Sequence, residues 1–253
     1  MGVLTLMYHR TPKKAGHWLD VPMPLFRSQI QALQSSGVRF IRFGEALESH
    51  WYSTGRTVVS VTFDDGHGSN LDAMAFLHDA GIPCTSFFVS GFVRKGQDGF
   101  MDPEMFKEAS MLCEVGAHGA SHTDLTSLEA SVLAAELASS KSYLEDLSGG
   151  SVTTLSAPGG RINQRVVRSA LELGYRVVGD SVALLNPTPR LPLHRICVAN
   201  GQSPGLLVSL ADAGRLYWLY RRLRRTSVSM AEKLVGDERL QRVKRTFNGD
   251  RET

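Results

Sequence analysis

Residues 57–90 read TVVSVTFDDGHGSNLDAMAFLHDAGIPCTSFFVS, and this stretch decides the fold. Its first seven residues are mostly β-branched or aromatic, which is typical of a buried strand. Residues 70–80 have the apolar spacing of a helix, and residues 84–90 again have the composition of a strand. A strand, a helix and a second strand in succession indicate a βα unit with parallel strands.

The same alternation extends in both directions from this unit. Further strands are expected at Val3–Tyr8, Arg39–Phe43, Val115–Ala117, Thr153–Ala157, Tyr175–Val178 and Arg195–Val198. Further helices are expected at Leu25–Gln34, at Pro103–Cys113, from Thr126 (as the cap of a TSLE capping box) to about Leu147, and at Gln164–Leu173. This rhythm favours a parallel sheet that is closed or nearly closed into a barrel, with an open doubly wound sheet as the alternative.

Length and composition place the chain among ordinary globular proteins. A chain of 253 residues suits one α/β barrel, and 42% hydrophobic with 21% charged residues argues against disorder, collagen-like repeats and disulfide scaffolds. The three cysteines show no CxxC spacing, which favours a reducing compartment. No apolar run reaches the roughly 18 to 20 residues of a spanning helix, and the run near the start is too short for a signal peptide. We therefore expect a cytoplasmic protein.

Charge is distributed unevenly along the chain. From Arg215 onward there are 11 Lys/Arg and 5 Asp/Glu, although the whole chain carries only +3. We expect a barrel domain over residues 1–200 and a basic helical extension over residues 201–253. The RLYWLYRRLRR segment in this extension has two interpretations: a helix that packs its aromatic side chains on the barrel, or a peripheral contact with an anionic membrane at its inner face. No nucleic-acid motif accompanies it, so we expect no nucleic-acid partner.

Two adjacent carboxylates, Asp64 and Asp65, end the strand at residues 57–63. Neighbouring side chains on a strand point to opposite faces, so joint action of the two acids requires the backbone to turn, and Gly66 and Gly68 make turning easy. A solvated turn that closes a strand is the commoner interpretation of DDG alone.

Two histidines, His118 and His122, follow the short strand expected at residues 115–117. Their i,i+4 spacing predicts that they share one face of a helical turn. With one carboxylate they form a two-histidine, one-acid ligand set, which leaves a coordination position open for water and so indicates catalysis. For HxxxH alone, two partly exposed histidines near a helix start are the commoner outcome.

Taken together, the two motifs resemble those of the polysaccharide deacetylases of carbohydrate esterase family 4. Residues 62–66 match the family's first motif, TFDDG, and His118 and His122 match both histidines of its second motif, H-S/T-x-x-H. The similarity extends over LMYHR, GIPCTSFFV and the helix that ends in KSYLEDLSGG, or about residues 4–198. It implies a distorted (β/α) barrel of seven or eight strands.

The resemblance also implies roles for individual residues. Asp65, His118 and His122 would hold a divalent metal, zinc by default with cobalt, nickel or manganese as alternatives, while Asp64 would be the catalytic base. His194 is the candidate general acid, although it could equally be a structural histidine beside a strand. His67 and His9 are further candidates, with His67 the better because it follows the DDG turn.

Departures from the family pattern occur in the second and third motifs. Gly119 stands where the family has Ser or Thr. The third motif, usually R-x-P-aromatic-G, reads Ser156–Gly160 here and lacks both the arginine and the aromatic residue. The Gly159 amide could still serve the oxyanion, and Arg161 is a candidate to replace the missing positive charge. Arg195 resembles an arginine of the exopolysaccharide-type relatives.

The expected function is therefore metal-dependent removal of N-acetyl groups from a glycan, or glycan precursor, that contains N-acetylhexosamine. An O-acetyl esterase that uses the same centre is one alternative. A catalytically silent glycan-binding protein is another, because the third motif is incomplete.

Overall fold

The computed structural model describes residues 2–214, 217–219 and 221. Its strands are β1 (Gly2–Tyr8), β2 (Arg39–Ile41), β3 (Thr57–Phe63), β4 (Cys84–Phe88), β5 (Glu114–Ala117), β6 (Thr154–Ser156), β7 (Val177–Gly179) and β8 (Arg195–Cys197). Its α-helices are α1 (Met23–Ser35), α2 (Leu71–Asp79), α3 (Ser90–Lys95), α4 (Pro103–Leu112), α5 (Ala130–Ser148), α6 (Gln164–Glu172) and α7 (Pro204–Asp212). Short 3-10 turns lie at Phe43–Glu45, Ser49–Tyr52, Gly68–Asn70, Leu125–Ser127 and Pro158–Gly160.

All the paired strands of the sheet are parallel, in the order β7-β6-β5-β4-β3-β1-β8, with β2 also paired to β3. A parallel bridge between Gly179, at the end of β7, and Leu193, just before β8, brings the two edges of the sheet together. The sheet is thus nearly closed into a barrel, as the sequence predicts, and the open doubly wound alternative is wrong.

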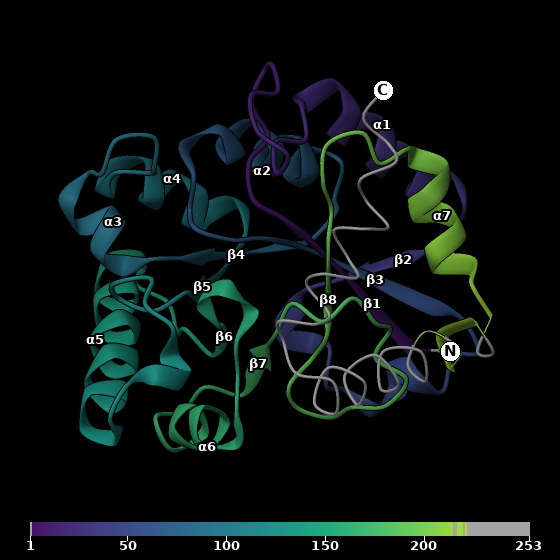
Figure 1. The fold of residues 1–253 in the computed structure, drawn as a ribbon. Coiled ribbons are helices and arrows are strands. Elements are labelled where there is room, and N and C mark those ends of the chain that lie inside the picture. Colours follow the sequence, from purple (N-terminus) through teal and green to yellow (C-terminus); the bar gives the residue numbers. More distant parts are fainter. Residues whose placement is uncertain (1, 215–216, 220, 222–253) are drawn as a thin grey trace, which may run out of the picture. The chain divides into compact units, whose positions relative to one another are not determined.

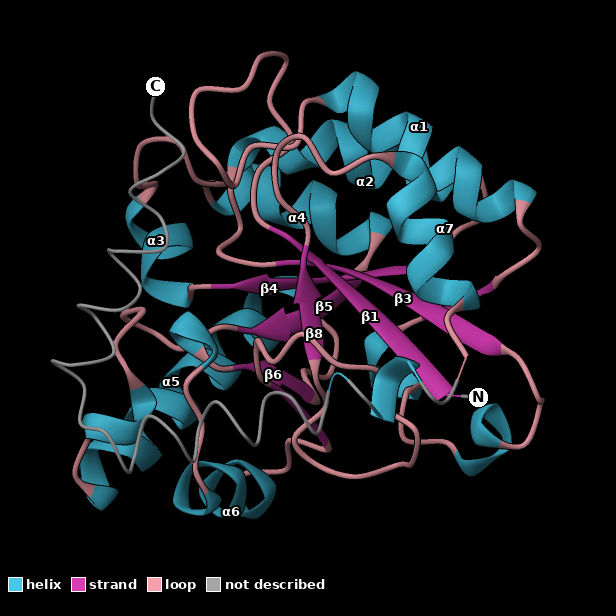
Figure 2. Cartoon of the chain, turned by 45° about the vertical axis from the view of Figure 1, so that its right-hand side comes forward, coloured by secondary structure: helices cyan, strands magenta, loops and turns pink. Residues whose placement is uncertain are grey.

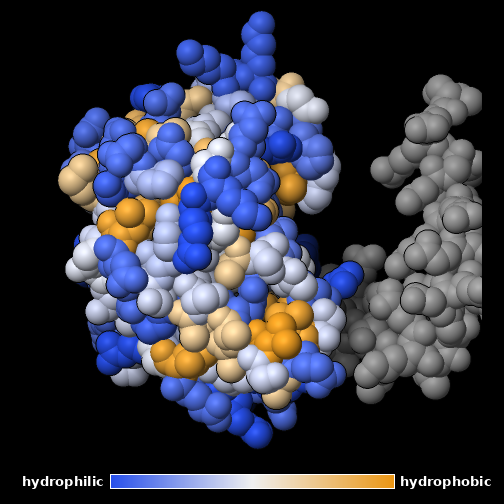
Figure 3. Space-filling view, turned by 90° about the vertical axis from the view of Figure 1, so that its left-hand side faces the viewer, coloured by the Kyte–Doolittle hydropathy of each residue, from blue (hydrophilic) through white to orange (hydrophobic). Residues whose placement is uncertain are grey.

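Helices surround the sheet in the order of the strands they cover (Figures 1 and 2). Helix α1 packs against α7 and α2, α2 against α4, α4 against α5, and α5 against α6. Strands β1 and β3 are buried along their whole length, as expected for central strands covered on both faces. On the face that bears α3 and α5, hydrophilic side chains surround separate small apolar patches (Figure 3).

Two expected local features are wrong. The TSLE segment does not cap the long helix: Thr126 lies in a 3-10 turn that the Asp124 side chain caps, and α5 starts after Glu129. Asp124 caps this turn in place of Thr126, because its carboxylate accepts hydrogen bonds from both the amide and the hydroxyl of Thr126. The residues around His118 and His122 form no helical turn, because Gly119 and His122 adopt left-handed φ values of 76° and 60°.

The chain divides into two compact units, Met1–Asp212 and Ala213–Thr253. Helix α7, which the sequence assigns to the extension, packs on α1 within the first unit. Most of the RLYWLYRRLRR segment lies outside the described residues, so its two interpretations stay predictions. Within the described part of the chain, no helix is both long and apolar enough to cross a membrane.

Candidate active site at the carboxyl edge

The functional candidates Asp64, Asp65 and His118 lie where their strands end, which we call the carboxyl edge of the barrel. Asp64 extends the β1–β3 ladder by one hydrogen bond, from its amide to the Tyr8 carbonyl at 2.9 Å. The next residue, Asp65, has a left-handed φ of 70°. The chain therefore turns at DDG as required for both carboxylates to serve one site.

Gly66 makes this turn possible. It has a φ of 73°, and a Cβ atom at this position would lie 2.7 Å from the Phe88 ring. Any other residue would be strained by its backbone and would clash with a buried side chain. The glycine of DDG is thus a structural requirement of the turn.

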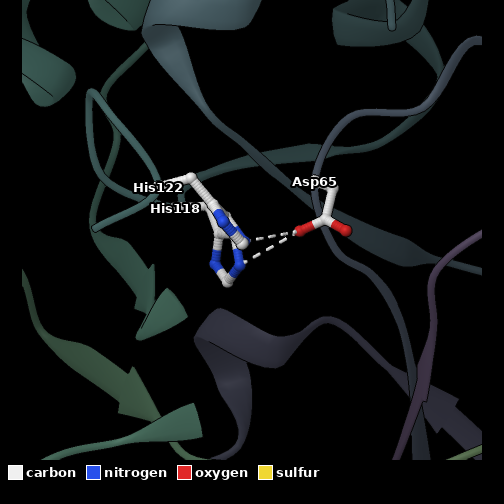
Figure 4. A group of neighbouring side chains, drawn as sticks. All are labelled: Asp65, His118 and His122. Carbon is white, nitrogen blue, oxygen red and sulfur yellow. Dashed lines mark ion pairs between the residues drawn. The ribbon is translucent and has the colours of Figure 1, made fainter. Parts of the chain in front are cut away.

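Asp65, His118 and His122 converge on one point (Figure 4). The Asp65 Oδ1 atom lies 3.3 Å from His118 Nε2 and 3.2 Å from His122 Nε2. The Nδ1 atom of His118 lies 2.9 Å from the Ser156 carbonyl, to which it can donate, so that Nε2 keeps its lone pair for another partner. One carboxylate oxygen and two imidazole nitrogens within 4.8 Å of one another fit a tetrahedral divalent ion with one open position.

Backbone strain coincides with this cluster. Asp65 and His122 are the two non-glycine residues with positive φ among the described residues. Each such conformation costs about 1–3 kcal/mol and persists only where the surroundings hold it. The histidine loop is held by Glu136 of α5, whose Oε1 atom accepts hydrogen bonds from the amides of Ala120 and Ser121 at 2.8 and 2.7 Å. Sequence reasoning missed Glu136, because its partners lie 15 and 16 residues away in the chain.

Protonation in this cluster follows the contacts. Burial would raise the pKa of Asp65, but hydrogen bonds from the two histidines hold it well below its usual value. The same bond to Asp65 raises the pKa of His122. A metal ion would therefore compete with a proton for the His122 nitrogen.

Arg195 holds Asp64 in a bidentate ion pair. Its Nη1 and Nη2 atoms lie 2.6 and 2.8 Å from the two carboxylate oxygens, and Nη2 also donates to Ser156 Oγ at 2.6 Å. Arg195 is fully buried and its Nε atom donates to the Asp180 carbonyl at 2.9 Å. Burial would raise the pKa of Asp64, but this guanidinium lowers it, so the carboxylate stays ionised.

The positive charge next to Asp64 therefore comes from Arg195 and not from Arg161. Arg161 has a side chain that is 74% exposed and pairs with Asp124 at 2.9 Å. The suggestion that Arg161 replaces the third-motif arginine is wrong, because adjacency in sequence does not bring its side chain to Asp64. Arg195 is likewise not a substrate contact in this structure, since it is covered completely.

His194 lies apart from the contacts that join Asp64, Asp65 and the histidine pair. Its Nδ1 atom is 3.0 Å from the Asp180 carboxylate, and its backbone is bonded to the Asn186 side chain. The Asp180 carboxylate therefore fixes the orientation of the His194 ring through its Nδ1 atom.

His9, ranked below His67 from the sequence, lies beside the cluster. It directly follows β1, and the charges of Asp64, Asp65, Arg195 and His118 all act on its ring. Its Nδ1 atom is buried without a hydrogen-bond partner, and burial lowers its pKa. The signal for His9 was its place directly after a strand, the same signal that marks Asp64 and His118.

The last two candidates lie in loops beside the cluster. His67 caps the 3-10 turn at Gly68–Asn70, where its Nδ1 atom accepts a hydrogen bond from the Ser69 amide at 3.2 Å, and its ring packs on Phe100. Gly159 is exposed in the loop directly after β6, the strand whose Ser156 contacts Asp64. Nothing lies within 4 Å of the Cβ position of Gly159, so space is open beside its backbone.

Comparison with known proteins gives a consistent result. Residues 52–178 match the family model described as "Polysaccharide deacetylase". The chain is 28% identical over 204 residues to "Putative polysaccharide deacetylase YxkH" of Bacillus subtilis (strain 168), covering 78% of this chain and 72% of that protein.

Solved structures show the same fold. The Streptococcus pyogenes deacetylase PplD in complex with acetate superimposes with a TM-score of 0.73 at 21% identity, covering 83% of this chain and 98% of that one. IcaB from Ammonifex degensii gives a TM-score of 0.73 at 24% identity, covering 84% and 97%. Because the family model spans half of the sequence and the fold agrees, the chain belongs to the polysaccharide deacetylase family.

Proposed function

We propose that the protein is a metal-dependent hydrolase that removes N-acetyl groups from a glycan containing N-acetylhexosamine. The observation that carries this proposal is the pairing of two sites at one edge: a three-ligand cluster at Asp65, and an ionised Asp64 held beside it by Arg195. Family membership supports the deacetylation reaction, and the chemistry of the ligands supports the metal.

Asp65, His118 and His122 would hold the ion, with zinc as the default for two imidazoles and one carboxylate. Such an ion lowers the pKa of a bound water toward about 7 and polarises an acyl oxygen. Asp64 would take the proton of the attacking water. Arg195 occupies both oxygens of Asp64 and so holds the carboxylate in one orientation, which keeps it available as a base rather than as a fourth ligand.

The bond that breaks is the C–N bond of the acetamido group. Water adds to the acetyl carbon, the carbonyl oxygen gains negative charge, and the Gly159 amide would stabilise that oxygen. The departing nitrogen needs a proton. His194 stays the proposed donor, because the Asp180 carboxylate 3.0 Å from its Nδ1 atom orients the ring, whereas burial lowers the pKa of His9 and disfavours the protonated form that would donate. Acetate and a free amine are the products.

The alternatives are affected differently by the structure. The case for a catalytically silent glycan-binding protein depended on the missing third-motif arginine, and Arg195 now supplies a guanidinium to the base. An O-acetyl esterase would use the same residues, so only substrate comparison separates it from the N-deacetylase.

The test is acetate release, measured on N-acetylglucosamine oligosaccharides and on O-acetylated xylo-oligosaccharides. We expect release from the N-acetylated sugars, loss of activity after chelation, and recovery on addition of zinc, cobalt, nickel or manganese. Faster release from the O-acetylated sugars would make the protein an esterase. Binding of the N-acetylated sugars without release in any metal would make it a binding protein.

Location follows from the proposed substrate and the basic tail. We propose that the protein acts in the cytoplasm on a glycan precursor, with the basic tail at the inner face of the membrane. Cosedimentation with vesicles of 30% phosphatidylserine tests this contact, and equal recovery with neutral vesicles contradicts it.

A further inference from the structure

A tryptophan stands exposed on the loop between β1 and α1. This loop projects beyond the end of β1 (Figures 1 and 2). Trp18 is 62% exposed, the largest exposed fraction of any aromatic side chain in the described part of the chain. The neighbouring His17 is also exposed, and the centroids of the two rings lie 5.8 Å apart. The loop thus presents an indole face together with a polar ring.

The turn that carries Trp18 is firmly held. Asp20, which is 5% exposed, accepts hydrogen bonds from the amides of Gly16 and His17 at 2.7 and 2.8 Å. Its other oxygen pairs with Arg10 at 2.7 Å. None of these bonds uses the indole. The exposed side chain is therefore displayed by an ordered turn whose stability does not depend on it.

The same turn is anchored to two loops of the carboxyl edge. On one side, Thr11 bonds to the backbone and side chain of Ser69, two residues after His67. On the other side, the Trp18 carbonyl accepts a hydrogen bond at 2.8 Å from the amide of Asn200, which lies in the loop after β8. Strand β8 bears Arg195, so Trp18 lies on the rim shared by the elements that position Asp64.

Indole and sugar surfaces are complementary. One face of a pyranose ring exposes C–H groups that stack on the negative face of an aromatic ring, while an indole N–H can donate to a hydroxyl group. Because Trp18 lies on the rim rather than among the catalytic carboxylates, it is placed to meet a sugar next to the one that is deacetylated.

We propose that Trp18 is a stacking platform for a second sugar residue, so that the enzyme prefers an oligosaccharide or polymer to a monosaccharide. This inference rests on the proposed function for its substrate class. The contact itself is a binding property and can be measured without turnover.

Binding is tested by the indole N–H signals of the ¹⁵N-labelled protein. The chain has three tryptophans, and Trp51, 6% exposed, is an internal control. Trp18→Phe assigns the Trp18 signal. We expect that signal to shift on addition of β-1,4- or β-1,6-linked pentasaccharides of N-acetylglucosamine at millimolar concentration, but not with the monosaccharide, while the Trp51 signal stays in place. No shift with either pentasaccharide overturns the proposal.

Kinetics provide the second test. Trp18→Ala should lower kcat/KM for the pentasaccharide about tenfold through KM and leave the monosaccharide unchanged, whereas Trp18→Phe should stay within about threefold of the natural protein. Met111→Ala, which removes another exposed apolar side chain, is the matched control and should change neither. Equal values for Trp18→Ala and the natural protein contradict the platform. An indole shift without any acetate release would instead refute the proposed function and leave the platform intact.

Discussion

Each edge of the barrel holds a carboxylate in a polar network, Asp64 at the carboxyl edge and Glu114 at the amino edge. The pKa of Asp64 is lowered and that of Glu114 is raised. At the carboxyl edge, the Arg195 guanidinium lowers the pKa of Asp64 despite burial. At the amino edge, Glu114 accepts hydrogen bonds from Thr85 and from the Gly44 amide, and burial raises its pKa. The pKa thus falls where a guanidinium faces the buried carboxylate, and it rises where burial outweighs the hydrogen bonds.

The two edges also differ in how their surroundings are used. Glu114 lines a hollow of about 670 Å³ together with Arg42, His78 and Cys113, but among the described residues it forms no ion pair. At the carboxyl edge, by contrast, ion pairs, strained backbone at Asp65 and His122, and the buried nitrogen of His9 gather at one place. Strained backbone next to interacting charged groups favours the carboxyl edge as the candidate site.

Removing the cation should produce the largest effect. In Arg195→Met, Asp64 loses its partner and becomes a buried acid without a cation, so we expect unfolding free energy to fall by about 3–5 kcal/mol and acetate release to be lost. Urea unfolding and an acetate assay measure both. Arg161→Met is the matched control, because it removes an arginine from an exposed pair and should leave both quantities unchanged. Similar losses in the two variants would mean that Arg195 has no special role.

Replacing the histidine at the site should affect turnover but not folding. We expect His194→Gln to lower kcat by about 10²- to 10⁴-fold, the usual contribution of a general acid, because Asp180 orients its ring. His9→Gln should reduce kcat less, because burial lowers the pKa of His9 and disfavours its protonated form. His78→Gln, at the amino-edge hollow, is the control. A larger loss in His9→Gln would give the acid role to His9.

The strained loop gives a smaller effect on stability. Gly119 has a φ of 76°, and a Cβ atom there would lie 3.1 Å from the Glu136 carboxylate that holds the histidine loop. We expect Gly119→Ala to cost about 1–2 kcal/mol and to weaken metal binding. Gly81, with a φ of 67° and nothing within 4 Å of its Cβ position, lies near the amino edge. Gly81→Ala should cost a similar amount and leave metal affinity unchanged. If both variants bind the metal equally well, the conformation of the histidine loop does not determine metal affinity.

The two carboxylates should also give opposite pH dependences of stability. The pKa of Asp64 is lowered on folding, so its contribution is present above about pH 3.9 and is lost as pH falls through the folded pKa. The pKa of Glu114 is raised on folding, so its ionisation destabilises the fold as pH rises above about 4.3.

Acid and neutral urea titrations of Asp64→Asn and Glu114→Gln measure these terms. We expect the stability lost in Asp64→Asn to grow from pH 2 to 5. Glu114→Gln, which keeps an acceptor for Thr85 and Gly44, should change stability by less than about 1 kcal/mol at pH 4 and gain relative to the natural protein at pH 7. If the change in unfolding free energy has the same pH dependence in both variants, the opposite pKa shifts of Asp64 and Glu114 are contradicted.

Local patterns in the sequence predict much of the fold and of the site. The expected strand at residues 57–63 coincides with β3, and the rule that functional residues follow parallel strands leads to the candidates Asp64, Asp65 and His118. The apolar spacings of strands (every second residue) and helices (every 3.6 residues) are local, so a single sequence is enough to recognise them.

Interactions between distant segments could not be predicted in this way. Arg195 reaches Asp64 across 131 residues, and no local pattern shows which arginine would enter the barrel. The HxxxH spacing predicts a helical turn, but the left-handed Gly119 and His122 bring the same side chains together through a loop. In both cases contacts between distant segments fix side-chain positions that residue spacing in the sequence does not determine.

The central claim is that Asp65 belongs to the metal ligands while its neighbour Asp64 is the base. Bound metal per chain and acetate release, measured together in Asp64→Asn and Asp65→Asn, test it most directly. We expect Asp64→Asn to retain one ion per chain and to lose turnover, and Asp65→Asn to lose both. Loss of the ion in Asp64→Asn, or unchanged turnover in that variant, would contradict the assignment.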